Sequence, residues 1–245
     1  MPAQQGSRGF SERVAVVSDG ANPFGRAVAL QLAMQGCYVV VGFADSSPES
    51  VRTLVELQSI GTLASAVHAD ISTIQGVTDL FEQVESMYGR LDLLVNTAQF
   101  QTKIDFSSID ENDFVEFINH NLKSVIFCSQ TALRLMKNRP NAAIVNLANE
   151  TGDQSDALFV MAQTALVGLT KSLAKFLAAK LGPKIRVNCV SFQSDQKPVS
   201  EYESLHSEYV VAPNDVARAV VYLLSPDAEA ITGQMISVGP KRTKI

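Results

Sequence analysis

Short runs of apolar, β-branched residues alternate along this chain with longer segments of helical periodicity. The first run, Val-Ala-Val-Val at 14–17, is followed by a turn, a helical pattern over 24–35 and a second run at 38–41. A run that is apolar at every position is typical of a strand buried on both faces. Since adjacent parallel strands need a crossover connection, usually a helix, the opening predicts a βαβ unit.

The same alternation continues through the whole chain of 245 residues. Further helices are expected at 48–60, 74–88, 111–136, 156–180 and 213–224, and further strands at 64–68, 91–95, 143–148, 185–190 and 234–238. We therefore predict a single α/β domain over 11–240, a doubly wound parallel sheet of the Rossmann type. The short ends, 1–10 and 241–245, are expected to be flexible.

Composition argues against several kinds of partner and site. The formal net charge is −5 and the isoelectric point is about 5.2, so neither a nucleic acid nor an anionic membrane is an expected partner. No apolar run approaches transmembrane length, and residues 1–10 contain no signal-peptide core. We therefore expect a cytoplasmic protein.

The cysteines and histidines are few and scattered. The three cysteines lie among apolar neighbours, which indicates buried thiols in a reducing compartment: Cys37, Cys128 and Cys189. The three histidines are equally far apart: His68, His120 and His206. Neither set has the spacing of a metal site, so no metal is expected.

Several short segments resemble landmarks of the short-chain dehydrogenase/reductase family. They are FVMAQTALVGLTKSLA at 159–174, GRLDLLVN at 89–96, NLKSV at 121–125, IVN at 144–146, IRVN at 185–188 and TGQ at 232–234. The resemblance extends from 13 to 238 and implies the fold predicted above. It also implies, for active members, nicotinamide-dependent chemistry and assembly into dimers and tetramers.

The catalytic positions that this resemblance implies do not carry the family's residues. The family's tyrosine and lysine, spaced Tyr-x-x-x-Lys, are replaced by Phe159 and Gln163, and the position of its serine falls at Asn149. Phe159 has no ionisable proton and Gln163 no charge, so the acid-base pair is missing. Asn121 matches the family's asparagine, but a helix-kink hydrogen bond would explain it equally well. None of the five tyrosines is followed four residues later by a lysine.

The first turn departs from the family pattern Thr-Gly-x-x-x-Gly-x-Gly. It reads SDGANPFG at 18–25, so that Asp19 and Pro23 replace two glycines and only Gly25 remains. The glycines allow a dinucleotide pyrophosphate to approach N–H groups at the start of a helix. At about 5 Å and an effective dielectric of about 20, the Asp19 charge would repel each unit of phosphate charge by about 3 kcal/mol, and Pro23 supplies no N–H group.

Of the remaining positions that bind the cofactor in the family, some keep the family's residue in this sequence and others do not. The family's Asn-Asn-Ala-Gly becomes Asn96-Thr97-Ala98-Gln99, where Gln99 places a side chain in the path of the cofactor. The acidic residue that binds the adenosine ribose would fall near Phe43. Asp70 matches the family's adenine-contacting aspartate, although it also suits the end of a strand. We therefore expect no bound cofactor.

The leading hypothesis is an inactive family member that assembles with an active paralogue in a heterotetramer. The helices at 111–136 and 156–180 correspond to the family's usual interface and retain apolar faces. One face of the second helix carries an apolar stripe, which core packing would also partly explain: Leu158, Met161, Ala165, Leu169, Leu173 and Phe176. Among inactive members, the chain resembles the non-catalytic subunit of a dehydrogenase of anaerobic toluene degradation.

Two other functions remain open from the sequence. One is a sensor that binds a metabolite or an acyl-CoA in the old pocket without turnover. The other is an oxidoreductase in which a different proton donor replaces the tyrosine, with Glu150, Asp153 and Asp156 as candidates. The altered cofactor turn argues against the second, because a new acid does not restore a hydride donor's site.

Overall fold

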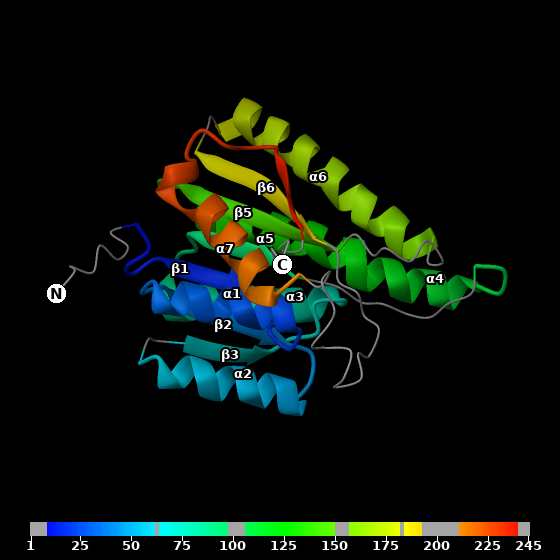
Figure 1. Cartoon of the computed structure of the whole chain (residues 1–245), viewed down its shortest axis with the longest axis horizontal. Helices are drawn as coiled ribbons and strands as arrows, with labels where there is room; N and C mark the ends of the chain where they lie inside the picture. Colours follow the sequence, from blue (N-terminus) through cyan, green and yellow to red (C-terminus); the bar gives the residue numbers. More distant parts are fainter. Residues whose placement is uncertain are drawn as a thin grey trace, which may run out of the picture.

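The computed structural model describes residues 9–61, 64–97, 106–149, 157–181, 184–192 and 211–239. Within this part of the chain, parallel strands form one seven-stranded sheet in the order β3-β2-β1-β4-β5-β6-β7 (Figure 1). The strands are β1 (Val14–Val17), β2 (Tyr38–Phe43), β3 (Ala64–His68), β4 (Leu93–Asn96), β5 (Ala142–Asn149), β6 (Ile185–Phe192) and β7 (Met235–Val238). The predicted fold class is confirmed, since every expected strand is present within a few residues of its predicted range.

Helices cover both faces of the sheet. They are α1 (Pro23–Met34), α2 (Pro48–Ser59), α3 (Ile74–Tyr88), α4 (Glu111–Ile118), α5 (Ser124–Met136), α6 (Ala157–Leu181) and α7 (Pro213–Leu224), with a short 3-10 turn, η2, at Pro226–Ala228. Alternate residues of β1 face opposite sides: Ala15 and Val17 pack with α1 and α7, whereas Val14 and Val16 pack with α3, α5 and α6. Each fully buried side chain of this kind stabilises the fold by about 1.5–3 kcal/mol.

The helix predicted over 111–136 is interrupted. A π-helical turn, η1 (Asn119–Lys123), joins α4 to α5. Asn121 lies in this turn, fully buried, and its Nδ2 donates a hydrogen bond to the carbonyl oxygen of Phe117 at 3.1 Å. An asparagine side chain competes with backbone donors for such carbonyls, which favours a wider turn at this position.

Helix α6 is apolar enough to require a correction. Among the described residues it is the one helix whose length and composition would allow it to cross a membrane. The expectation that no segment approaches this character is therefore wrong. A single helix of this kind is weak evidence for a membrane protein, because core helices of soluble proteins pass the same test, and α6 packs against β5 and β6.

The buried Arg186 closes the end of α7. Its guanidinium donates hydrogen bonds to four carbonyl oxygens at or just after the end of that helix, those of Leu223, Leu224, Ser225 and Ala228. The side chain is 4% exposed, so these carbonyls have little access to water. A charged donor that satisfies helix-terminal carbonyls stabilises both the helix and its contact with β6.

We predict that Arg186→Met lowers the free energy of unfolding by about 2–4 kcal/mol, because several buried carbonyls lose their donor. Urea denaturation followed by circular dichroism measures the change. Arg218→Met is the matched control, since the exposed Arg218 pairs with Asp215 on the surface and such pairs contribute about 0–1 kcal/mol. Equal losses in the two variants would contradict the role given to Arg186.

Candidate functional site

The candidate site lies at the carboxyl edge of the sheet, where parallel α/β folds bind their ligands. The turn after β1 lies beside the end of β4, and the end of β4 lies beside β5, because β1, β4 and β5 are neighbours in the sheet. Asn149 ends β5, and α6 begins at Ala157. The turn, Asn149 and the start of α6 therefore lie around one edge.

The turn after β1 satisfies its own hydrogen-bond donors. One carboxyl oxygen of Asp19 accepts the Ala21 N–H at 2.9 Å, and the other accepts Asn22 Nδ2 at 3.1 Å. The Asp19 backbone N–H and carbonyl both bond to the Thr97 hydroxyl, at 3.0 and 2.7 Å. Burial raises the pKa of the Asp19 carboxyl, and the hydrogen bonds from Asn22 and Ala21 oppose that rise.

Side-chain hydrogen bonds also cap the start of α1. Asn22 is the N-cap, and its Oδ1 accepts the Gly25 N–H at 2.8 Å. Pro23 occupies the first helical turn and has no N–H group. Asn22 Nδ2 also donates to the carbonyl oxygens of Asp19 and Thr97, which holds the cap in place. The N–H groups of Ala21 and Gly25 are thus capped by side chains, and position 23 has no N–H group.

Packing explains why Gly25 is retained. A Cβ at this position would lie 2.0 Å from the carbonyl oxygen of Asp19, closer than real contacts allow. A glycine is therefore needed for α1 to approach the turn, whether or not a ligand binds. The residue predicted as a surviving cofactor position also has a purely structural role.

Aromatic side chains fill space beside the turn. Phe24 and Phe192 are both buried, and their ring centroids lie 4.0 Å apart, so they join the start of α1 to the end of β6. Phe43, at the position expected for a ribose-binding acid, is 5% exposed, and its ring lies against Gly20. Among the described residues, buried aromatic rings therefore occupy positions beside the turn, and position 43 supplies no acid for a ribose.

The other predicted cofactor positions are structural where they can be described. Asn96 lies in the core, where its Nδ2 donates to Asn146 Oδ1 at 2.8 Å and to Ser129 Oγ at 3.1 Å. Asp70 caps the turn after β3, with its carboxyl accepting the Ser72 N–H at 3.0 Å. Gln99 lies outside the described residues, as do Glu150, Asp153 and Asp156, the alternative proton donors.

The degenerate catalytic positions lie in the protein interior. Phe159 is 1% exposed and packs with Phe117, Leu158 and Ala162. Gln163 is 3% exposed, and its Oε1 accepts the Asn149 N–H at 2.8 Å. The structure thus brings Phe159, Gln163 and Asn149 together, but none of the three carries an acid or a base that could exchange a proton at neutral pH.

The hydrogen bond with the Asn149 N–H fixes the orientation of the Gln163 side-chain amide. Its oxygen must face the Asn149 N–H, so its Nε2 points the other way. That nitrogen is buried and has no hydrogen-bond partner within the part of the chain that the structure describes. A buried donor without an acceptor costs about 1–3 kcal/mol, which a bound water or a ligand oxygen would offset.

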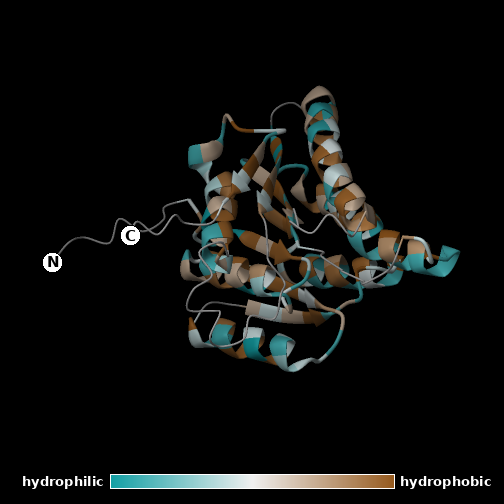
Figure 2. Cartoon of the chain, turned by 45° about the vertical axis from the view of Figure 1, so that its right-hand side comes forward, coloured by the Kyte–Doolittle hydropathy of each residue, from teal (hydrophilic) through white to brown (hydrophobic). Residues whose placement is uncertain are grey.

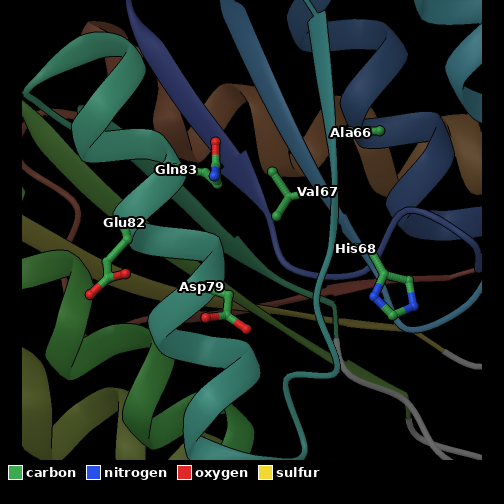
Figure 3. Close-up of a pocket in the computed structure, with 6 residues that line it drawn as sticks. All are labelled: Ala66, Val67, His68, Asp79, Glu82 and Gln83. Carbon is green, nitrogen blue, oxygen red and sulfur yellow. The ribbon is translucent and has the colours of Figure 1, made fainter.

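A shallow hollow of about 420 Å³ lies elsewhere, at the β3 edge of the sheet. Figure 3 shows Asp79, Glu82 and Gln83 on α3, which lies beside the strand. The other residues that line the hollow are Ala66, Val67 and His68. Three strands separate β3 from β5, and no group of three metal-ligating side chains occurs among the described residues, so this hollow adds no chemistry to the site.

The buried thiols agree with the expectation from sequence. Cys37, Cys128 and Cys189 are all fully buried. Burial raises the pKa of Cys37 and of Cys128 to about 12, so neither thiol is a nucleophile at neutral pH.

A model of the family described as enoyl-(acyl carrier protein) reductase matches residues 20–239. The chain belongs to the short-chain dehydrogenase/reductase family. The chain is 31% identical to the 3-oxoacyl-[acyl-carrier-protein] reductase FabG of Staphylococcus aureus, over 91% of this chain and 95% of FabG. It is 30% identical to the (2S)-[(R)-hydroxy(phenyl)methyl]succinyl-CoA dehydrogenase subunit BbsD of Thauera aromatica, over 94% and 96%.

Solved structures of the same family have the same fold. A short-chain dehydrogenase from Burkholderia cenocepacia J2315, crystallised in complex with NADP, superposes with a TM-score of 0.82 at 25% identity, covering 94% of this chain and 97% of that one. The fold is therefore retained closely, while the turn after β1 and the start of α6 differ from the family pattern.

We predict no binding of NAD⁺, NADH, NADP⁺ or NADPH by the isolated chain, because Asp19 and Asn22 occupy the phosphate-binding donors and Phe24 and Phe192 fill the neighbouring space. Isothermal titration calorimetry measures this, with an active short-chain dehydrogenase as positive control. A micromolar dissociation constant for any of the four would show that the turn can open.

We also predict that Phe159→Tyr combined with Gln163→Lys gives no turnover of alcohols or ketones, because the phosphate turn and the serine remain absent.

Gln163→Lys alone should lower the free energy of unfolding by about 2–4 kcal/mol, since it buries an ammonium group and removes the acceptor for the Asn149 N–H. Thr164→Lys, at the exposed neighbouring position, is the stability control. NAD(P)H absorbance measures the turnover of the double variant, and urea titration measures the stability of the single variants. Detectable turnover would show that the turn after β1 still binds the cofactor.

Proposed function

We propose that this chain is a catalytically inactive member of the short-chain dehydrogenase/reductase family that assembles with an active, NAD-dependent alcohol dehydrogenase paralogue and supports it. The observation that carries the proposal is the two-sided character of α6. Its inner face buries Phe159 and Gln163 where the family has its acid-base pair, and its outer face exposes apolar side chains. The chemistry is lost on one side of the helix while a docking surface is kept on the other.

The outer face of α6 is largely uncovered. Val160, Met161 and Phe176 are 43%, 42% and 53% exposed. Of the stripe predicted from the sequence, Leu158 is buried and Leu169 and Leu173 are partly buried against the core, whereas Met161, Ala165 and Phe176 face outward. Core packing therefore explains only part of the stripe, as expected.

The neighbouring helices extend this face. Phe114 and Val115 on α4 and Ile126 on α5 are each between 42% and 47% exposed. The start of α6 packs against α4 and η1 through Phe117, and Figure 2 shows hydrophobic residues along much of α6. Exposed apolar surface of this extent is typical of a protein–protein interface.

One relative supports a partner of a particular kind. The Thauera aromatica relative is named as one subunit of a succinyl-CoA dehydrogenase. We propose that this chain corresponds to the inactive subunit of 2-[hydroxy(phenyl)methyl]succinyl-CoA dehydrogenase in anaerobic toluene degradation and that the complex is a heterotetramer. An isologous interface built for two identical chains can be kept when one of them loses its site.

A second function has one observation in its favour. The unpartnered Nε2 of Gln163 could donate to a carbonyl oxygen of a metabolite or acyl-CoA held in the vestigial pocket. In that case the chain would be a sensor and would bind ligand without turnover. The sensor and subunit functions differ in what they require, since only the second needs a partner chain.

We predict that Val160→Glu abolishes the complex with the active paralogue and lowers the paralogue's activity, because it places a charge on the apolar outer face of α6. The half-buried Val167 is less suitable, since a glutamate there would also test folding. Co-expression followed by size-exclusion chromatography with mass detection measures assembly. The matched control is Val55→Glu on α2, which makes the same change at a position 59% exposed and far from α6 in sequence.

Two outcomes would contradict the proposal. One is a wild-type chain that runs as a monodisperse monomer beside every short-chain dehydrogenase encoded next to it. The other is equal loss of the complex in Val160→Glu and Val55→Glu, which would show that assembly does not depend on the outer face of α6. The first outcome would favour the sensor function.

A further inference from the structure

The Asp19 side chain does more than place a negative charge in the turn. Its two oxygens accept one backbone N–H, from Ala21, and one side-chain N–H, from Asn22, at 2.9 and 3.1 Å. Two oxygens that accept diverging N–H donors at the start of a helix make the kind of contacts that phosphate oxygens make there. The helix dipole of α1 favours an anion at this point as well.

We propose that the Asp19 carboxyl group is a built-in occupant of the phosphate-binding turn, which takes the hydrogen bonds of a bound phosphate and so excludes phosphate and pyrophosphate groups. The turn is then closed by one side chain and retains donors that could bind an anion. This inference rests on the proposed loss of cofactor binding but is independent of assembly with a partner.

The residues around Asp19 indicate that its carboxyl group takes the place of a phosphate and does not merely repel one. Asn22 is held from three directions, by the Gly25 N–H and by the carbonyls of Asp19 and Thr97, so its amide stays in place when the carboxyl is removed. Asp19 is half-buried, which means that solvent reaches the space its side chain would vacate. Gly25 keeps α1 close to the turn, so the Ala21 N–H stays next to the start of the helix.

Two substitutions of Asp19 distinguish between two ways in which its carboxyl group could exclude phosphate: by taking the hydrogen bonds of the phosphate, or by charge repulsion alone. Asp19→Gly removes both the charge and the acceptors, whereas Asp19→Asn removes the charge but keeps an oxygen for the Ala21 N–H. Asp45→Asn is the matched control, since Asp45 is an exposed carboxylate in the loop after β2 that accepts only the Ser47 N–H among the described contacts. The probe is inorganic pyrophosphate, titrated calorimetrically into each full-length variant.

We expect no saturable binding by the wild-type chain or by Asp45→Asn, and at least about tenfold tighter binding by Asp19→Gly than by Asp19→Asn. The amide resonance of Ala21 should shift on titration of Asp19→Gly. If Asp19→Asn binds as tightly as Asp19→Gly, charge repulsion alone closes the turn and the occupancy proposal fails.

A folded Asp19→Gly variant that binds no pyrophosphate would also overturn the proposal, with circular dichroism and the melting temperature as the test of folding. If that variant does not fold, Asp19→Ser replaces it and the same criteria apply. Size-exclusion chromatography of the wild-type chain with its paralogue, run on the same preparations, shows whether the subunit proposal fails independently.

Discussion

The close approach of α1 to the turn after β1 is the contact on which the rest of the site depends. Gly25 lies so near the carbonyl of Asp19 that no side chain fits between them. Thr97 then ties the turn to the end of β4, and Asn22 caps the helix. These contacts need no ligand, so the backbone of a nucleotide-binding turn can persist after the side chains that served a cofactor have been replaced.

The second constraint is that α6 must cover the sheet on one side and can face a partner on the other. A buried phenylalanine or glutamine satisfies the inner face as well as a tyrosine or lysine does, provided that its polar atoms find partners, and the Asn149 N–H supplies one. Phe159 and Gln163 therefore preserve the packing of the inner face, although the buried Gln163 Nε2 is left without a hydrogen-bond partner among the described residues. Val160, Met161 and Phe176 are exposed on the other face, and the proposed partner would bury them.

Much of the fold could be predicted because uninterrupted apolar runs allow few alternatives to a buried parallel strand, and β1 and β3 have the predicted bounds. The replacements at Phe159 and Gln163 could also be read directly, since the surrounding helix fixes the frame. The π turn at Asn119–Lys123 could not, because it depends on one side-chain bond. The sequence likewise predicted Asp19 only as a repelling charge; its hydrogen bonds to Ala21 and Asn22 depend on the turn geometry.

The most direct test of the account is to count dinucleotides on the assembled complex by native mass spectrometry. The chain and its active paralogue are co-expressed, purified together and saturated with NAD(H). If this chain is an inactive subunit with a closed turn, the complex carries one dinucleotide for each paralogue chain and none for this chain. A complex in which every chain carries a dinucleotide would contradict the account.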